Sequence, residues 1–149
     1  HYCFEANPDA IFYSYKLFKL NHMKIKIEEK ALGNGSKNFF YAVNDYILSS
    51  FEKPKNTDLF NRIEVSTIKL SKVVKDKRPT AIFCDIEGAE RNFLPPEDLH
   101  GVSKVIIELH PGIYGNSVVR DIKNNFIGNG FFCVEKNKDT YCFIRHCSY

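Results

Sequence analysis

This chain of 149 residues has no apolar run that approaches the roughly 18 residues needed to cross a membrane. It also lacks a basic segment followed by an apolar one near residue 1, so no signal peptide is expected. The net charge of +3 is too small to indicate nucleic acid binding, and the short basic stretches lack interleaved stacking aromatics. We therefore expect a cytoplasmic protein that binds neither nucleic acid nor a membrane.

The cysteine pattern does not indicate a disulfide framework or a metal site. The five cysteines are an odd number, and none forms a Cys-x-x-Cys pair. Free thiols in a reducing compartment are the expected state. Cys133 and Cys142 could face each other across a hairpin, so one disulfide stays open.

The composition is that of an ordinary folded domain. Apolar residues make up 44% and charged residues 26%, and 149 residues suit one domain, 1–149, with a real core. Strand-like and helix-like segments alternate, and no repeat or linker divides them. This order predicts an α/β fold with a mainly parallel sheet covered by helices and a terminal antiparallel hairpin. Strands are expected at 1–4, 23–29, 39–43, 62–68, 80–84, 102–109, 131–134 and 140–144, and helices at 10–21, 69–77 and 113–127.

Within this pattern, the turn at 33–36 predicts a hairpin that brings strand 39–43 back on strand 23–29, because Asn34-Gly35 favours positive φ. The segment 80–84 reads as a strand buried on both faces.

Three carboxylates follow the strand at 80–84 within six residues. They are Asp85, Glu87 and Glu90, with Gly88 among them. Ligands of open α/β sheets bind outside the carboxyl ends of the strands. Acids also favour helix N-termini, but three acids fit that alternative less well than one.

Two further polar residues close predicted strands. Glu5 follows the first strand, where an acid commonly accepts hydrogen bonds from both ribose hydroxyls of a nucleotide. A helix cap explains Glu5 equally well. His110 follows the strand at 102–109, and histidine titrates near neutral pH and often accepts protons, although a histidine at a turn is more often structural.

Together these segments resemble the FkbM family of S-adenosylmethionine-dependent methyltransferases. The matching elements are residues 4–9 (FEANPD), 31–33 (ALG), 85–90 (DIEGAE) and 107–111 (IELHP), in the family's order and spacing. The resemblance implies a class I methyltransferase fold, a Rossmann-like sheet with a C-terminal antiparallel hairpin. It also implies transfer of a methyl group from S-adenosylmethionine to a hydroxyl of a sugar or another small molecule.

The resemblance also implies roles for individual residues. Glu5, Asn7, Ala31 and Asp85 would bind the cofactor. Asp85 and His110 would be catalytic or position the substrate, with Glu87 supporting them, and no metal would be needed. As nucleophile positioning accounts for much of the acceleration in methyl transfer, Asp85 is more useful for receiving a proton or orienting a ligand than as a counter-charge to sulfonium.

One departure from the class I pattern concerns the start of the domain. Such enzymes begin with a strand, a glycine-rich loop and a helix before the ribose-binding acid, whereas that acid is residue 5 here. The expectation is therefore a partial domain that lacks the first strand and helix, with a gap at the middle of its sheet.

Two alternatives to a methyltransferase remain open. One is a non-catalytic binding or structural domain that retains the fold without the cofactor loop. The other is a divalent-metal hydrolase using Asp85, Glu87, Glu108 and His110, since such side chains hold Mg²⁺ or Mn²⁺. The segment 45–61 is the expected place for acceptor contacts or for a homodimer.

Overall fold

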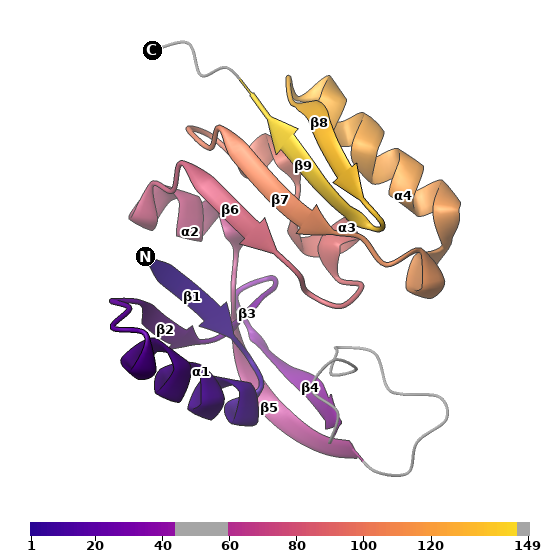
Figure 1. Cartoon of the computed structure of the whole chain (residues 1–149). Coiled ribbons are helices and arrows are strands. Elements are labelled where there is room, and N and C mark those ends of the chain that lie inside the picture. Colours follow the sequence, from indigo (N-terminus) through magenta and orange to yellow (C-terminus); the bar gives the residue numbers. More distant parts are fainter. Residues whose placement is uncertain (44–59, 146–149) are drawn as a thin grey trace. The chain divides into compact units, whose positions relative to one another are not determined.

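The computed structural model describes residues 1–43 and 60–145, and Figure 1 labels its helices and strands. The chain divides into two compact units, His1–Lys69 and Leu70–Tyr149. Most of the segment expected to contact an acceptor, 45–61, lies outside the described residues. None of the helices in the described ranges is long and apolar enough to cross a membrane. The expectation of a single domain stays a prediction.

The first unit begins with a β-α-β segment. Strands β1 (Tyr2–Glu5) and β2 (Lys26–Glu29) pair in parallel, and α1 (Pro8–Leu20) connects them. Asn7 caps α1, because its side chain accepts a hydrogen bond from the Asp9 amide at 3.0 Å. In parallel pairing the carboxyl ends of both strands meet at one edge, so Glu5 lies opposite Glu29.

The second sheet of this unit corrects the predicted hairpin. Strand β5 (Phe60–Ile68) lies between β3 (Ala31–Leu32), which is parallel to it, and β4 (Lys37–Val43), which is antiparallel. The turn at 33–36 therefore crosses the end of β5 instead of joining two paired strands. Thr67 stabilises the turn at 33–36, because its hydroxyl accepts a hydrogen bond from the Gly35 amide at 3.0 Å.

The second unit contains a four-stranded sheet in the order β6-β7-β9-β8. Strands β6 (Ala81–Cys84) and β7 (Lys104–Glu108) are parallel, and β9 (Thr140–Ile144) joins them antiparallel. Strand β8 (Phe132–Asn137) completes the expected terminal hairpin with β9. The structure is thus an α/β fold with several sheets, and its described cysteines, Cys3, Cys84, Cys133 and Cys142, are free.

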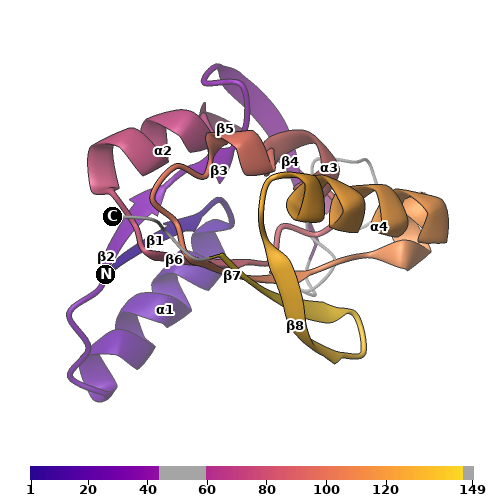
Figure 2. The same ribbon diagram turned by 90° about the horizontal axis from the view of Figure 1, so that it is seen from above.

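Helices of the second unit lie along one face of this sheet, as Figure 2 shows. They are α2 (Leu70–Lys77), the short α3 (Glu90–Phe93) and η2 (Pro96–Asp98), and α4 (Pro111–Gly128). The largest buried side chains on the covered face come from strands and α4 alike, for example Ile107, Phe126 and Phe143. Phe126 and Phe143 stack with ring centroids 4.5 Å apart.

The prediction that strand 80–84 is buried on both faces is wrong. Cys84 is buried, but Phe83 is 78% exposed. Successive side chains of a strand point to opposite faces, and β6 is an edge strand of a sheet whose helices lie on one side. The neighbouring strand β7 is also buried on one face only: Val105 and Ile107 have 0% and 1% exposure, whereas Ile106 is half-buried and Lys104 and Glu108 are exposed.

Candidate functional site

The chain turns sharply after β6, and this turn presents the acidic motif. Asp85 follows the last strand residue, Glu87 has a φ of +50°, and Gly88 has a φ of +94°. A Cβ atom at Gly88 would lie 2.9 Å from two side-chain atoms of Ile113. Only glycine combines this backbone conformation with so close a neighbour, so Gly88 is required for the path of the loop.

His110 stands at the other strand end, between β7 and α4. Pro111 begins α4, where a missing amide proton costs nothing, and His110 is the N-cap residue. The imidazole makes no capping hydrogen bond. Instead the backbone amide of His110 donates to the Tyr114 hydroxyl at 2.7 Å. The ring is therefore left available for contacts across the sheet edge.

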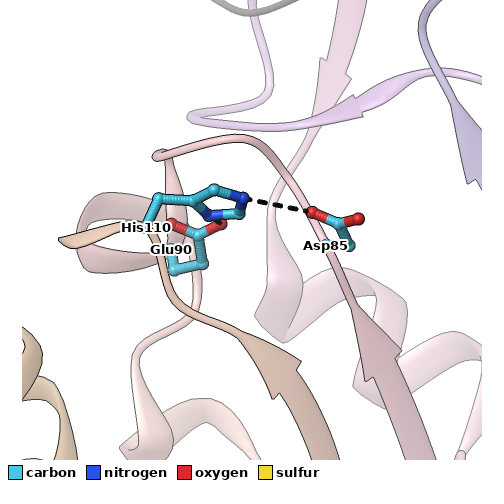
Figure 3. Close-up of side chains that lie close together, drawn as sticks. All are labelled: Asp85, Glu90 and His110. Atoms are coloured by element: carbon cyan, nitrogen blue, oxygen red, sulfur yellow. Dashed lines mark hydrogen bonds and ion pairs between the residues drawn. The ribbon is translucent and has the colours of Figure 1, made fainter. Parts of the chain in front are cut away.

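The two strand ends meet through this imidazole. His110 Nε2 lies 3.3 Å from a carboxylate oxygen of Glu87 and 3.6 Å from one of Asp85, while Nδ1 lies 3.0 Å from Glu90 Oε1. Figure 3 shows the ring between Asp85 on the loop after β6 and Glu90 at the start of α3. One imidazole thus faces three carboxylates, and the cluster keeps a net negative charge even when His110 is protonated.

These carboxylates differ greatly in their access to water. The Asp85 side chain is 55% exposed and that of Glu87 26%, whereas that of Glu90 is fully buried. Glu90 Oε1 accepts hydrogen bonds from the Gly88 amide at 3.2 Å and, weakly, from the Ile86 amide at 3.4 Å. Its other oxygen, Oε2, is buried without a hydrogen-bond partner among the described residues.

Burial and the contacts within the cluster shift the pKa values of His110, Glu90 and Glu87. The hydrogen bond to Glu90 raises the pKa of His110 above 6.5, although burial opposes this. Burial alone would raise the pKa of Glu90, but the hydrogen bonds from His110 and the backbone outweigh it and hold that pKa below 4.5. Burial, aided by the Asp85 carboxylate, raises the pKa of Glu87.

Of the predicted cofactor residues in the first unit, Glu5 and Asn7 lie at the turn between β1 and α1, and Ala31 lies in β3. Glu5 Oε1 accepts hydrogen bonds from the amides of Ala6 at 2.7 Å and Asn7 at 2.8 Å. Among the described residues, these hydrogen bonds of the Glu5 carboxylate are both made by Oε1. Asn7 is 3% exposed and is occupied as a helix cap. Ala31 lies half-buried in β3, opposite Thr67. Glu5 therefore stabilises the turn with one carboxylate oxygen and retains the other.

A cavity of about 500 Å³ opens beside this turn. Its lining comes from the turn, α1, β2 and β5, namely Ala6, Pro8, Ile11, Glu29, Ile63, Glu64, Val65 and Ser66.

Three residues of the cluster in the second unit are also candidate metal ligands. Ligand atoms of Asp85, Glu90 and His110 lie within 4.8 Å of one another, close enough to hold one cation. Both ring nitrogens of His110 already face carboxylates, and Glu90 Oε1 already accepts backbone amides. The fourth residue of the metal alternative, Glu108, is an exposed residue outside this group. The geometry is that of an ion-pair network around one imidazole, and we assign it no metal.

Of the predicted site residues, Asp85, Glu87 and His110 lie together within the second unit, and the roles assigned to them and to Glu5 stay predictions. The residue that sequence reasoning left without a role is Glu90. Its only signals were its place in the acidic motif and the need of a proton-accepting histidine for an orienting partner.

Comparison with known proteins adds one finding. Neither the curated proteins nor the solved structures include a match to this chain. The model of the methyltransferase FkbM domain family matches residues 1–149, the full length given. The chain therefore belongs to the FkbM methyltransferase family.

Proposed function

We propose that this protein is an S-adenosylmethionine-dependent methyltransferase that methylates a hydroxyl group of a sugar or another small molecule. The observation that carries the proposal is the imidazole of His110, positioned at a strand end among Asp85, Glu87 and Glu90. Family membership supports methyl transfer as the reaction. A hydroxyl acceptor fits because an alcohol must lose a proton as it attacks the methyl group, and His110 can receive that proton.

The Nε2 atom of His110 is the proposed proton acceptor. It faces Asp85 and Glu87, whose carboxylates are both reachable from solvent. The reacting hydroxyl would donate its single proton to Nε2, and Asp85, the more exposed of the two, is suited to accept a hydrogen bond from another hydroxyl of the acceptor and so hold that molecule beside His110. Such positioning supplies a large share of the acceleration in a displacement reaction. Glu87 stabilises the imidazolium that forms.

The donor set of the chain fits the cofactor. S-adenosylmethionine supplies a methyl group on a sulfonium, and its adenosine carries two ribose hydroxyls. The second oxygen of Glu5 is suited to accept from such hydroxyls, because the amides of Ala6 and Asn7 already hold the first. Asn7 and Ala31 would shape that site through the backbone around them.

The fold is compatible with a class I, Rossmann-like arrangement. The parallel pair β6-β7 followed by the antiparallel pair β8-β9 is the expected C-terminal half of such a sheet. We further propose that the acceptor is a small molecule or glycan and that the protein works in the cytoplasm, with a homodimer as its assembly.

The test has a binding arm and an activity arm. S-adenosylmethionine and S-adenosylhomocysteine are titrated into this chain and into one extended by any residues encoded upstream, followed by transfer of a labelled methyl group to a panel of hydroxyl acceptors. Asp85→Asn and His110→Ala are each expected to lower kcat by roughly 100-fold or more, the usual scale of general-base catalysis. Unchanged activity in both variants would overturn the assigned roles. Absence of binding in both chains would favour a non-catalytic domain.

A further inference from the structure

We propose that Glu90 is a positioning residue that fixes His110 in its Nδ1–H tautomer, so that Nε2 is the nitrogen that receives the substrate proton. The inference rests on the proposed methyl transfer for its meaning in catalysis. Its structural content, the tautomer of one imidazole, stands independently of any activity. Glu90 itself, fully buried, would touch neither substrate nor cofactor.

Hydrogen-bond chemistry assigns the proton on Nδ1. An ionised carboxylate can only accept hydrogen bonds, so a 3.0 Å contact between Glu90 Oε1 and His110 Nδ1 requires the proton on the nitrogen. Glu90 Oε1 already accepts the backbone amides of Gly88 and Ile86, and these hydrogen bonds favour the ionised form and help to hold its pKa below the usual range. Nε2 of the neutral ring then carries the lone pair.

The opposite tautomer is disfavoured by distance and by burial. With the proton on Nε2, the ring would donate to Glu87 at 3.3 Å or to Asp85 at 3.6 Å, both longer than the contact to Glu90. Water competes for the exposed Asp85 carboxylate and, to a smaller extent, for the partly shielded Glu87, but not for Glu90. The lone pair of Nδ1 would also face a buried charge without a proton between them, which costs free energy.

A merely structural role would leave the burial of Glu90 poorly explained. Removing a carboxylate from water is costly, and an ion pair in the interior often contributes less stability than apolar packing would. Here the carboxylate even leaves Oε2 without a partner among the described residues. A carboxylate that orients the distal nitrogen of a histidine is a recurring way to set both the tautomer and the basicity of the ring.

The groups that face His110 come from each element around it. They are Asp85 and Glu87 on the loop after β6, Glu90 of α3, and Tyr114 of α4, whose hydroxyl accepts from the His110 amide. Glu108 lies near Glu87, and Cys84 stays neutral because burial raises its pKa. Of these, Glu90 alone contacts Nδ1, so its removal has a signature that no other substitution shares.

Nuclear magnetic resonance of protein labelled with ¹⁵N-histidine tests the inference directly. The chain has five histidines, and the His110→Gln spectrum identifies the signals of His110. Above the pKa of His110, the wild type is expected to show a protonated Nδ1 and an unprotonated Nε2. A wild-type signal from the Nε2–H tautomer would overturn the proposal, and this reading needs no folded variant of Glu90.

Glu90→Gln, with Glu87→Gln as matched control, supplies the second measurement. Glu90→Gln is expected to lower the pKa of His110, shift its tautomers towards a mixture and reduce kcat at least tenfold while KM changes little. Glu87→Gln should leave the Nδ1–H tautomer in place. An unchanged tautomer and pH profile in Glu90→Gln would refute the positioning role. The expected tautomer in a wild type that neither binds the cofactor nor transfers a methyl group would uphold the tautomer assignment and refute the proposed function instead.

Discussion

Replacement of Gly88 by alanine probes how the acidic loop is held. Gly88 has a φ of +94°, and a Cβ atom there would meet Ile113 Cδ1 and Cγ2 at 2.9 Å. The left-handed backbone alone costs an alanine about 1–2 kcal/mol. Forcing extra volume against a neighbour costs typically another 1–3 kcal/mol. Ile113 is 49% exposed and can yield, so we expect a total loss of about 2–3 kcal/mol.

Alanine substitutions at other glycines of the second unit separate the backbone cost from the contact cost. Gly101 has a φ of +79° with nothing within 4 Å of a Cβ atom, so Gly101→Ala carries the backbone cost alone. Gly128 lies in α4 with neither problem, and Gly128→Ala should be neutral or slightly stabilising. Adding Ile113→Ala to Gly88→Ala should recover the contact cost and leave a loss near that of Gly101→Ala.

Urea denaturation followed by circular dichroism measures all these differences. A loss of 2 kcal/mol corresponds to a fall in Tm of roughly 4–8 °C for a domain of this size. If Gly88→Ala is no more destabilising than Gly101→Ala, the close approach of the loop to Ile113 is refuted. If Ile113→Ala gives no recovery in the double variant, the extra cost has another origin.

Three further predictions concern the cap, the ion pair and metals. Asn7→Ala should destabilise by about 1 kcal/mol in urea denaturation because the helix cap is lost, and Asn7→Asp should retain most of the stability. The stability that Glu90→Gln removes should be largest between about pH 4.5 and 6.5, where Glu90 is ionised and His110 protonated, and should shrink as acid protonates Glu90 or as rising pH neutralises His110. Chelation by EDTA should leave methyl transfer unchanged, and calorimetric titration with Mg²⁺ or Mn²⁺ should show no binding; restoration of activity by either ion would revive the metal alternative.

Local patterns predicted the elements that carry the second-unit cluster. Polar residues after apolar strands marked the ends of β6 and β7, and parallel pairing of these strands brings their carboxyl ends to one edge. Asp85 and His110 therefore came together as expected. Helix α2 was also predicted closely, since Leu70, Val73 and Val74 share one face at helical spacing and are buried.

The sequence did not predict which strands pair when they lie far apart along the chain. The turn at 33–36 has hairpin chemistry, yet β4 pairs with β5, a strand more than fifteen residues further along the chain. Which partner a strand takes depends on the faces that become buried together, and local turn signals do not encode that choice. The exposure of Phe83 has the same origin, because an apolar run does not reveal whether one or both faces of its strand are covered.

The burial of Glu90 was not predicted from the sequence either, and it changes the interpretation of the acidic motif. Three similar carboxylates in sequence become three different groups in space: Asp85 open to solvent, Glu87 partly shielded and Glu90 enclosed. Burial of an acid depends on what packs over it, and here the decisive partners are the His110 ring and the Gly88 amide. Position within the motif could not distinguish them.

The effect of a negatively charged cluster on methyl transfer depends on which positive charge its carboxylates contact. In the proposed reaction a positive charge disappears at sulfur, so carboxylates near sulfur would stabilise the reactants more than the transition state. A second positive charge appears on His110 as it receives the acceptor proton, and Glu90, Glu87 and Asp85 all lie within 3.6 Å of that ring. Their stabilisation grows as the imidazolium forms, and the fully buried Glu90 acts with the least screening by water. The cluster therefore favours catalysis to the extent that its carboxylates contact the histidine and not the sulfonium.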